Sequence, residues 1–217
     1  MGRAKYSEDK RRDMLLMFIQ TTRGLIDSDG IDQVTIRKIA KASCYNSATI
    51  YLYFHDLDEL VCLAAMCYVE EFVRAWAEGM KKPMTTLETY CFSWEMFATY
   101  AFKHAQVYNH LFFYPHSRPF AETVRYYHEL FPERLEDIGY VIEEILLGST
   151  HVERESSILL PLTEDGRVSK DDLPMISTLA SCHFRKLLDT KCRLGDAVDD
   201  GELVRQQLNA VHFLLRM

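Results

Sequence analysis

The chain has 217 residues, a net charge of −7 and an aromatic content of 12%, and this length is sufficient for a well-buried core in one or two domains. No apolar run approaches the roughly 20 residues that a membrane span needs, and the basic, polar N-terminus lacks the apolar core of a signal peptide. These features argue against a membrane protein, and we expect a cytoplasmic location with the six cysteines reduced.

Charge is unevenly distributed along the chain. Residues 1–55 contain nine Lys or Arg and six Asp or Glu, a net charge of +3, so the remaining residues carry −10. A mildly basic head on an acidic body fits nucleic-acid binding that is confined to one end of the chain. The same distribution argues against a body that wraps nucleic acid.

The first predicted element is a helix over residues 7–27, preceded by a short basic arm at residues 1–6. Apolar residues in this helix recur at the spacing of one helical face, which predicts that this face packs on a core. Gly30 predicts the end of the helix, because glycine adopts the left-handed conformation of a helix terminus without strain. The arm either brings Arg3 and Lys5 to DNA or is disordered.

Two short helices separated by a tight turn come next. Residues 35–42 place apolar side chains on one helical face and basic side chains on the other, and residues 43–46 suit a turn. Asn46 or Ser47 can cap a second helix over residues 47–54, because a short side-chain oxygen accepts from free backbone N–H groups. This spacing fits either a helix-turn-helix or an ordinary helical hairpin.

A string of residues in this region keeps a single register: Thr35, Ile39, Ala40, Thr49, Ile50, Tyr51, Tyr53, Phe54, Glu59 and Leu60. The string resembles the DNA-binding signature of the TetR family of bacterial repressors. The resemblance extends from about Arg12 to Val61, and Gly30 stands where the family's first helix ends. Two positions depart from the family pattern. Ser43 replaces the usual glycine, and Leu57 replaces a lysine that usually contacts DNA phosphate.

The resemblance implies that residues 35–42 cross the DNA backbone and that residues 47–54 enter the major groove. No Arg or Lys occurs in the second segment, so readout depends on Asn and Ser hydrogen bonds, methyl contacts and tyrosine hydroxyls. Ile50 and Phe54 are expected to pack inward. The predicted DNA-binding residues are Thr35, Arg37, Lys38, Lys41, Tyr45, Asn46, Ser47, Ala48, Thr49, Tyr51 and Tyr53.

A long helix over residues 57–81 is expected to link two domains. One is a helix-turn-helix DNA-binding domain at residues 1–55, and the other is a helical effector-binding and dimerisation domain at residues 56–217. The acidic residues at the start of the linking helix suit the positive end of the helix dipole, although they repel nearby phosphates. In the family resembled here, such a helix transmits the signal between domains.

The next predicted helix, over residues 85–103, is unusually aromatic, and aromatic residues with histidines continue to residue 116. These rings either pack a core or line a cavity for a small hydrophobic or aromatic effector. The family's architecture also implies an effector cavity in this part of the chain. The predicted effector-binding residues are Tyr90, Trp94, Phe97, His104, Tyr108, Phe112, Arg125 and Tyr126.

No metal site, cofactor or catalytic site is predicted. The histidines are scattered without an HxxxH or HExxH pattern, and the cysteines form no CxxC pair. No nucleophile elbow, phosphate loop or paired-carboxylate signature occurs, so we do not expect an enzyme. Cys182 and Cys192 could have a redox role, but inert thiols are the simpler interpretation.

Apolar helices are also predicted at the end of the chain. They can bury one face in their own domain and another in a partner, or be buried within the monomer alone. We favour a two-fold homodimer through residues about 174–216, because such symmetry matches a palindromic operator. The helices predicted beyond residue 116 span residues 122–131, 133–147, 151–162, 174–193 and 201–216, with a polar loop at residues 163–172.

The sequence therefore predicts an all-α protein with an N-terminal three-helix helix-turn-helix domain and a larger C-terminal helical domain. The predicted function is that of a ligand-released repressor, a dimer that binds palindromic double-stranded operator DNA. The alternative is a TetR-like fold with weak or lost specific DNA binding, acting as a small-molecule or protein-binding module.

Overall fold

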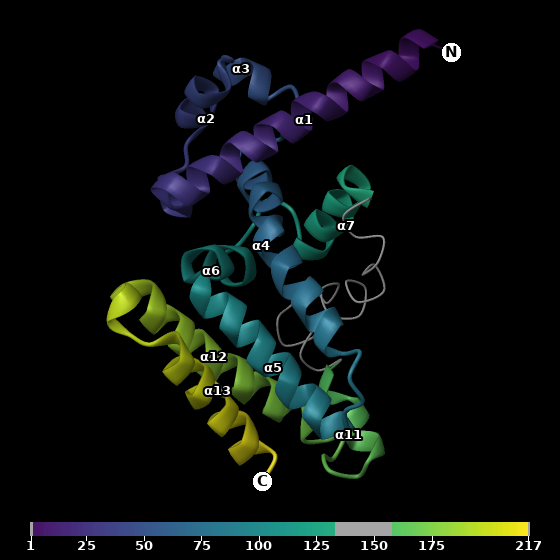
Figure 1. Ribbon diagram of the computed structural model, residues 1–217, viewed down its shortest axis with the longest axis vertical. Helices are drawn as coiled ribbons and strands as arrows, with labels where there is room; N and C mark the ends of the chain where they lie inside the picture. The colour runs from purple at the N-terminus through teal and green to yellow at the C-terminus, as the bar shows by residue number, and fades with distance from the viewer. Residues whose placement is uncertain (1, 133–157, 217) are drawn as a thin grey trace. The chain divides into compact units, whose positions relative to one another are not determined.

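The computed structural model describes residues 2–132 and 158–216, and every regular element within those ranges is helical (Figure 1). This confirms the predicted all-α class. The chain divides into two compact units. Unit 1 comprises residues 1–67 and 115–135, and unit 2 comprises residues 68–114 and 136–217. No described helix is long and apolar enough to cross a membrane.

Unit 1 begins with the long helix α1 (Gly2–Asp29). The helix starts earlier than predicted, so the expected basic arm is helical from its second residue. Most of its predicted apolar stripe is buried, with Leu25 half-buried, and Phe18 and Thr22 are fully inaccessible to solvent. Gly30 follows with φ 87°, a conformation that glycine adopts without a steric penalty. The short helix η1 (Ile31–Gln33) then leads the chain away.

Two short helices, α2 (Ile36–Ser43) and α3 (Ser47–Ile50), lie beside α1 (Figure 1). The prediction of a helix over residues 47–54 was wrong in length. The amides of Leu52 and Tyr53 donate to carbonyls three residues earlier, over 3.1 and 3.0 Å. This tighter pattern forms a turn, and the regular helix ends at Ile50.

Unit 1 is completed by residues far along the chain. Helix α4 (Leu57–Gly79) contributes its first part to unit 1 and its remainder to unit 2. Helix α7 (Phe120–Leu130) belongs to unit 1, where Arg12 Nη2 donates to the carbonyl oxygen of Leu130 over 2.9 Å. The contacts thus add a late segment to the N-terminal unit, whereas the sequence prediction placed a single boundary between residues 55 and 56.

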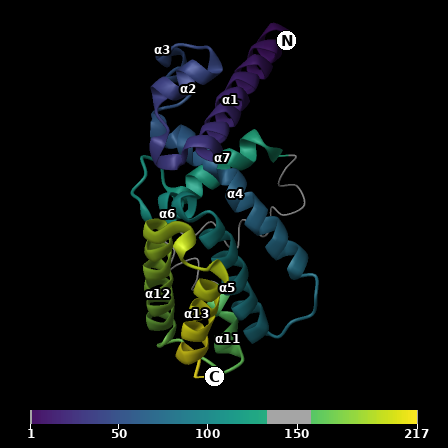
Figure 2. The same cartoon turned by 60° about the vertical axis from the view of Figure 1, so that its left-hand side comes forward.

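Unit 2 is a bundle in which α5, α12 and α13 lie side by side, as Figures 1 and 2 both show. The two final helices match the predicted ones within two residues at each end. Asp199 caps the last one by accepting from the backbone N–H of Glu202 over 2.8 Å. The elements of this unit after α4 are α5 (Thr86–Lys103), α6 (Ala105–Phe113), α11 (Pro161–Glu164), α12 (Leu173–Leu194), η2 (Gly195–Ala197) and α13 (Asp200–Leu214).

Two buried rings with polar tips form hydrogen bonds in the core of unit 2. The indole N–H of Trp76 donates to Ser93 Oγ over 2.9 Å, and the Tyr108 hydroxyl donates to the carbonyl oxygen of Tyr68 over 3.2 Å. These bonds offset the cost of removing the polar groups from water. The predicted helix at residues 133–147 and most of the one at 151–162 lie outside the described residues.

Candidate nucleic-acid interface

Each of the helices α2 and α3 begins at a side-chain cap. Thr35 Oγ1 accepts from the backbone N–H of Lys38 over 3.2 Å and starts α2. Cys44 ends it in the left-handed conformation, with φ 60°. Asn46 Oδ1 then accepts from the backbone N–H of Thr49 over 2.8 Å and from its hydroxyl over 3.0 Å. Asn46 is therefore the predicted cap of α3, and its carboxamide oxygen already has two donors.

Phe18 of α1 anchors the face that carries the candidate residues. Its ring centroid lies 5.6 Å from that of Tyr45 and 5.8 Å from that of Tyr53. Both tyrosines therefore use part of their rings for packing, although Tyr45 remains exposed. Ile50 and Phe54 are buried, which confirms that these two residues point inward. The burial of Ile50 fixes the rotation of α3 about its axis and turns its polar residues outward.

The basic residues of α2 differ in their availability. Lys38 Nζ lies 2.6 Å from Asp29 Oδ2 at the end of α1, and hydrogen bonds from Lys38 and Ser28 lower the pKa of Asp29. Arg37 and Lys41 are exposed and form no ion pair with residues in the described ranges. These two cations are thus better placed than Lys38 to contact phosphate.

The structure brings all eleven predicted DNA-binding residues together in one segment of unit 1. Seven are exposed, namely Thr35, Arg37, Lys41, Tyr45, Asn46, Ala48 and Tyr51. The other four are half-buried, namely Lys38, Ser47, Thr49 and Tyr53. Leu52 was not predicted to be at this surface but is 71% exposed. No local pattern marks an apolar residue at this position as part of a binding surface.

Acidic residues at the start of α4 are bound within unit 1 itself. Asp56 Oδ1 accepts from the backbone N–H of Glu59 over 2.8 Å and caps the helix. Glu59 is buried and its Oε1 lies 2.7 Å from Arg118 Nη2. The positive charge of Arg118 at this distance offsets the negative charge of the Glu59 carboxylate. The half-buried Leu57 between these acids stands where the family usually has lysine.

Asp58 is held by the two residues that precede Arg118. Its Oδ1 lies 2.9 Å from His116 Nδ1, and its Oδ2 accepts from the backbone N–H of Ser117 over 2.9 Å. Burial alone would raise the pKa of Asp58, but these hydrogen bonds outweigh it and the pKa is lowered. Sequence reasoning missed residues 116–118, because no local pattern links them to a helix 58 residues earlier.

The candidate effector-binding residues fall into both units. Tyr90, Trp94, Phe97, His104, Tyr108 and Phe112 belong to unit 2, whereas Arg125 and Tyr126 belong to unit 1. Arg125 is exposed, and the ring of Tyr126 lies under Arg118, whose Cζ is 4.9 Å from the ring centroid.

The unit 2 candidates form a packed aromatic cluster. The ring centroid of Phe97 lies 5.7 Å from Tyr108, 5.4 Å from Phe112 and 5.0 Å from Phe184. Tyr90, Trp94, Phe97 and Tyr108 are buried, and His104 and Phe112 are half-buried. The cluster serves as core in this conformation, and its role in binding an effector remains a prediction.

Unit 2 also has an open pocket of about 650 Å³ between α6 and α12. None of the predicted effector-binding residues lines it. Arg185, Lys186 and Arg193 contribute positive charge and Asp189 contributes negative charge, so a polar or anionic ligand would suit it better than an apolar one. The pocket was not predicted from the sequence, because alternating charges on a helix usually indicate a solvent-exposed face.

Comparisons with known proteins agree with this geometry. Residues 18–62 match the family model described as bacterial regulatory proteins, tetR family. No curated protein sequence matches the chain. The matched residues include α2 and α3, and so cover most of the candidate nucleic-acid interface.

Solved structures resemble nearly the whole chain. RolR in complex with resorcinol is 19% identical, with a TM-score of 0.59 over 97% of this chain and 89% of that one. FadR from Thermus thermophilus, a TetR-family transcriptional repressor in complex with lauroyl-CoA, is 16% identical with a TM-score of 0.60 over 93% of each chain.

A third structure, the transcriptional regulator FadR from Bacillus subtilis in complex with stearoyl-CoA, is 16% identical with a TM-score of 0.55 over 92% of this chain and 97% of that one. At sequence identities this low, the three structures show that the chain shares their fold. The match over residues 18–62 identifies this part of unit 1 as the N-terminal domain of the tetR family of bacterial regulatory proteins.

Proposed function

We propose that the protein is a ligand-released transcriptional repressor that binds palindromic double-stranded operator DNA as a homodimer. The observation that carries the proposal is the exposed polar face of α2 and α3. On that face α2 carries Arg37 and Lys41, which are exposed and form no ion pair within the described ranges, and Ile50 of the following helix is buried. Such a face supplies phosphate contacts on one helix and base-reading groups on the next.

The proposed reading helix favours modest specificity from each monomer. It carries Ser47, Ala48 and Thr49 but no Arg or Lys, so guanine cannot be read by a bidentate arginine. Asn46 is used as the cap, which leaves its amide N–H groups for DNA. Two copies of this face on a two-fold axis would double the contact set and match two half-sites one helical turn apart.

Exposed apolar residues on the last two helices support the homodimer. Met175 and Leu179 lie one helical turn apart on α12 and are 62% and 46% exposed, and Phe213 on α13 is 80% exposed. Apolar side chains of this size at the surface of a helical bundle are typical of an interface. Sedimentation of the wild type as a dimer, and of Leu179→Lys as a monomer, is the expected result.

The proposed effector is a small hydrophobic or aromatic compound that binds unit 2. The aromatic cluster around Phe97 supports it, and solved structures of the same fold are complexes with resorcinol or an acyl-CoA. The effector would favour a conformation in which the two reading helices no longer match successive grooves. By linkage, operator DNA must then weaken effector binding by the same factor.

DNA binding is tested with fragments upstream of the chain's own gene, by fluorescence anisotropy at several salt concentrations. Tyr51→Ala should weaken binding roughly 10- to 30-fold, because a hydrogen bond of about 1 kcal/mol is lost in each of two copies. Tyr114→Ala is the matched control, since Tyr114 is 56% exposed in unit 2 and Tyr51 is 54% exposed in unit 1. Equal affinities for the two variants would contradict the proposed reading helix.

Release by ligand is tested by titrating resorcinol and lauroyl-CoA into the protein, with and without the bound DNA fragment. Fluorescence of Trp94 in the aromatic cluster provides the signal. A compound that binds unit 2 should have a lower affinity in the presence of DNA, with a matching loss of DNA affinity in its presence. Binding of equal affinity in both cases would remove the switch from the proposal.

A second candidate is a regulator-like fold without specific DNA binding. The half-buried Leu57, in the place of a phosphate-binding lysine, favours it. In that case the anisotropy measurement would give weak binding that is the same for every DNA fragment and falls steeply with salt. The titration of unit 2 with small molecules would still give saturable binding.

A further inference from the structure

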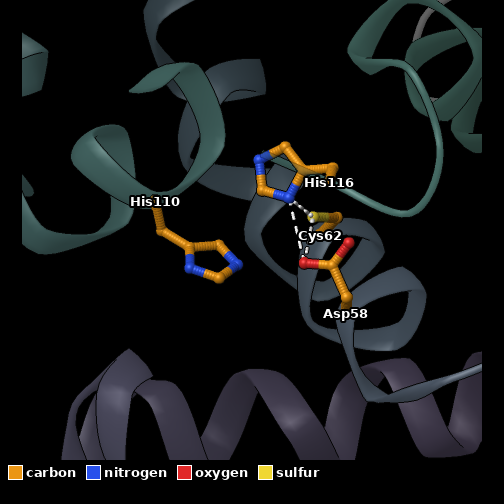
Figure 3. A group of neighbouring side chains, drawn as sticks. All are labelled: Asp58, Cys62, His110 and His116. Atoms are coloured by element: carbon orange, nitrogen blue, oxygen red, sulfur yellow. Dashed lines mark hydrogen bonds and ion pairs between the residues drawn. The ribbon is translucent and has the colours of Figure 1, made fainter. Parts of the chain in front are cut away.

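Three chemically different side chains converge in unit 1, as Figure 3 shows. Asp58 and Cys62 lie one turn apart on the same face of α4, and His116 comes from the segment that precedes α7. The Cys62 side chain is buried, and the His116 side chain is 8% exposed. Figure 3 also draws His110, which belongs to unit 2.

The three polar atoms form a compact triangle. His116 Nδ1 lies 2.9 Å from Asp58 Oδ1 and 3.3 Å from Cys62 Sγ, and the sulfur lies 3.8 Å from the same carboxylate oxygen. A point equidistant from three atoms at these separations is about 2 Å from each, close to the bond lengths of zinc to nitrogen, oxygen and sulfur. An ion slightly above the plane of the three atoms, where its distance to sulfur approaches the usual value, would have three ligands and one open tetrahedral position.

The surroundings of Asp58 orient it toward this point. Ser117 donates to Asp58 Oδ2 from its backbone N–H over 2.9 Å and from its hydroxyl over 3.2 Å. Oδ2 is thereby occupied, and Oδ1 faces His116 and Cys62. Hydrogen bonds of this kind to the second oxygen of a carboxylate are usual around metal ligands, where they fix the orientation of the ligand.

We propose that Asp58, Cys62 and His116 form a binding site for a divalent transition metal ion, with zinc as the best match. One thiolate, one imidazole and one carboxylate are the ligand types that zinc accepts together, whereas magnesium and calcium favour oxygen alone. The ion would join the first turns of α4 to the segment before α7, across 54 residues of sequence. It would thus stabilise the unit that carries the DNA-binding face.

Charge and protons balance in the proposed site. In the metal-free protein, burial and then the charge of Asp58 raise the pKa of the Cys62 thiol, so this group carries its proton. Binding of the ion releases that proton to solvent, and neutral His116 binds through the Nδ1 lone pair with its own proton on Nε2. The two positive charges of the ion then meet one thiolate and one carboxylate, so the site is neutral overall.

The simpler explanation of the triangle is a hydrogen-bonded cluster without metal. His116 can donate to Asp58, and the Cys62 thiol can donate to the same oxygen. In that arrangement two donors share one carboxylate oxygen, and no ligand is needed. This explanation predicts that the protein has no measurable affinity for Zn²⁺ at these residues, which makes the two directly distinguishable.

The experiment uses the full chain, stripped of metal with a chelator and titrated with Co²⁺. Wild-type protein should bind one ion per chain, with a thiolate-to-cobalt charge-transfer band in the near ultraviolet and visible bands typical of tetrahedral Co²⁺. One equivalent of Zn²⁺ should abolish both sets of bands. Zn²⁺ should also raise the thermal unfolding midpoint of the protein.

Two ligand variants and one control assign the site. Cys62→Ser should lose the charge-transfer band, and His116→Gln should lower metal affinity by about 100-fold or more, because each removes a direct ligand. Cys67→Ser is the matched control, since Cys67 is a second buried cysteine of α4 whose thiol donates to the carbonyl oxygen of Ala64 over 3.2 Å. This variant should keep the band.

Absence of the band in the wild type would overturn the proposal, and so would a band that survives in Cys62→Ser. Circular dichroism of each variant checks that it is folded. If Cys62→Ser fails to fold, loss of metal affinity in folded His116→Gln supports the site, and wild-type affinity in that variant refutes it. None of these readouts depends on DNA, so they are independent of the proposed function.

Discussion

Each unit of the protein contains a fully buried phenylalanine, Phe18 in unit 1 and Phe184 in unit 2, and the neighbours of these two rings differ. Phe18 in unit 1 contacts the rings of Tyr45, at 5.6 Å, and Tyr53, at 5.8 Å. Tyr45 is 45% exposed. Phe184 in unit 2 contacts the ring of Trp94 at 5.6 Å, and Trp94 is 4% exposed. The aromatic core therefore includes an exposed ring in unit 1, whereas in unit 2 the rings around Phe184 are buried or half-buried.

This difference separates the two functional proposals. In unit 1, some candidate DNA-binding residues cap a helix and others pack one side of their ring on the core. Both kinds keep part of their side chain free to contact DNA. In unit 2, the candidate effector-binding residues are the core itself. A ligand would have to displace packed rings there or open a minor conformation, and either costs free energy that the ligand must supply.

The largest expected effect concerns the aromatic core of unit 2. Phe184→Ala should lower the free energy of unfolding of unit 2 by about 3 to 5 kcal/mol, because a large cavity replaces a ring packed on several others. Urea denaturation followed by tryptophan fluorescence measures it selectively, since both tryptophans, Trp76 and Trp94, lie in unit 2. The exposed Tyr114→Ala serves as control. A loss below about 1 kcal/mol would mean that the cluster is loosely packed and open to ligands.

The buried ion pair of unit 1 should give the next largest effect. Arg118→Met leaves Glu59 buried without its cation, and we expect a loss of about 2 kcal/mol because Arg118 is itself partly exposed, which reduces the usual penalty. Hydrogen–deuterium exchange should then increase at the start of α4 while unit 2 stays unchanged. Arg125→Met is the matched control on α7, since Arg125 is exposed.

Equal exchange in the two arginine variants would show that the pair is not needed for the stability of unit 1. The Glu59→Gln, Arg118→Met double variant sharpens the result. If the two residues interact directly, the double variant should be more stable than the sum of the single losses predicts.

One helix cap in each unit allows a comparison in which the expected loss of stability is the same. Asn46 caps α3 in unit 1 over 2.8 Å, and Asp199 caps α13 in unit 2, also over 2.8 Å. Replacement of either by alanine should cost about 1 kcal/mol of stability. Only Asn46→Ala should also weaken DNA binding in the anisotropy measurement. The comparison would fail if Asp199→Ala weakened DNA binding as much.

Much of unit 1 could be predicted from sequence because its determinants are local. Thr35 and Asn46 cap helices through bonds that span three residues, and the inward positions of Ile50 and Phe54 follow from the family pattern. The shortness of α3 was missed, because the switch to tighter hydrogen bonds after Ile50 depends on how the chain turns toward α4. Local patterns do not specify such a turn.

The polar contacts of α4 could not be predicted, because their partners lie far away in the sequence. Residues 116–118 carry no motif, and Asp58 and Cys62 gave no recognisable metal pattern without a third ligand. The pocket lined by Arg185 and Lys186 was missed for the same reason: its walls come from separate helices, and charged residues on a helix are usually just solvated.

The smallest expected effect concerns Lys38, the one basic residue of α2 that is bound within unit 1. Asp29→Asn should release its ammonium group from the 2.6 Å contact and let it reach phosphate. We expect DNA binding that is tighter by no more than roughly threefold, because exposed ion pairs are weak. The gain should shrink as salt concentration rises.

The pH dependence of stability gives a second check on the same pair. Hydrogen bonds from Lys38 and Ser28 lower the pKa of Asp29 below its usual value of 3.8. A lowered pKa means that the folded state favours the charged carboxylate, so the stabilisation is complete above the usual value and is lost as the pH falls through the lowered one. Wild type should therefore exceed Asp29→Asn in its urea midpoint at neutral pH and lose that advantage in acid. A difference that persisted unchanged in acid would assign the effect of the substitution to the helix terminus rather than to the ion pair, and Lys38 would then be as available to DNA as Arg37 and Lys41.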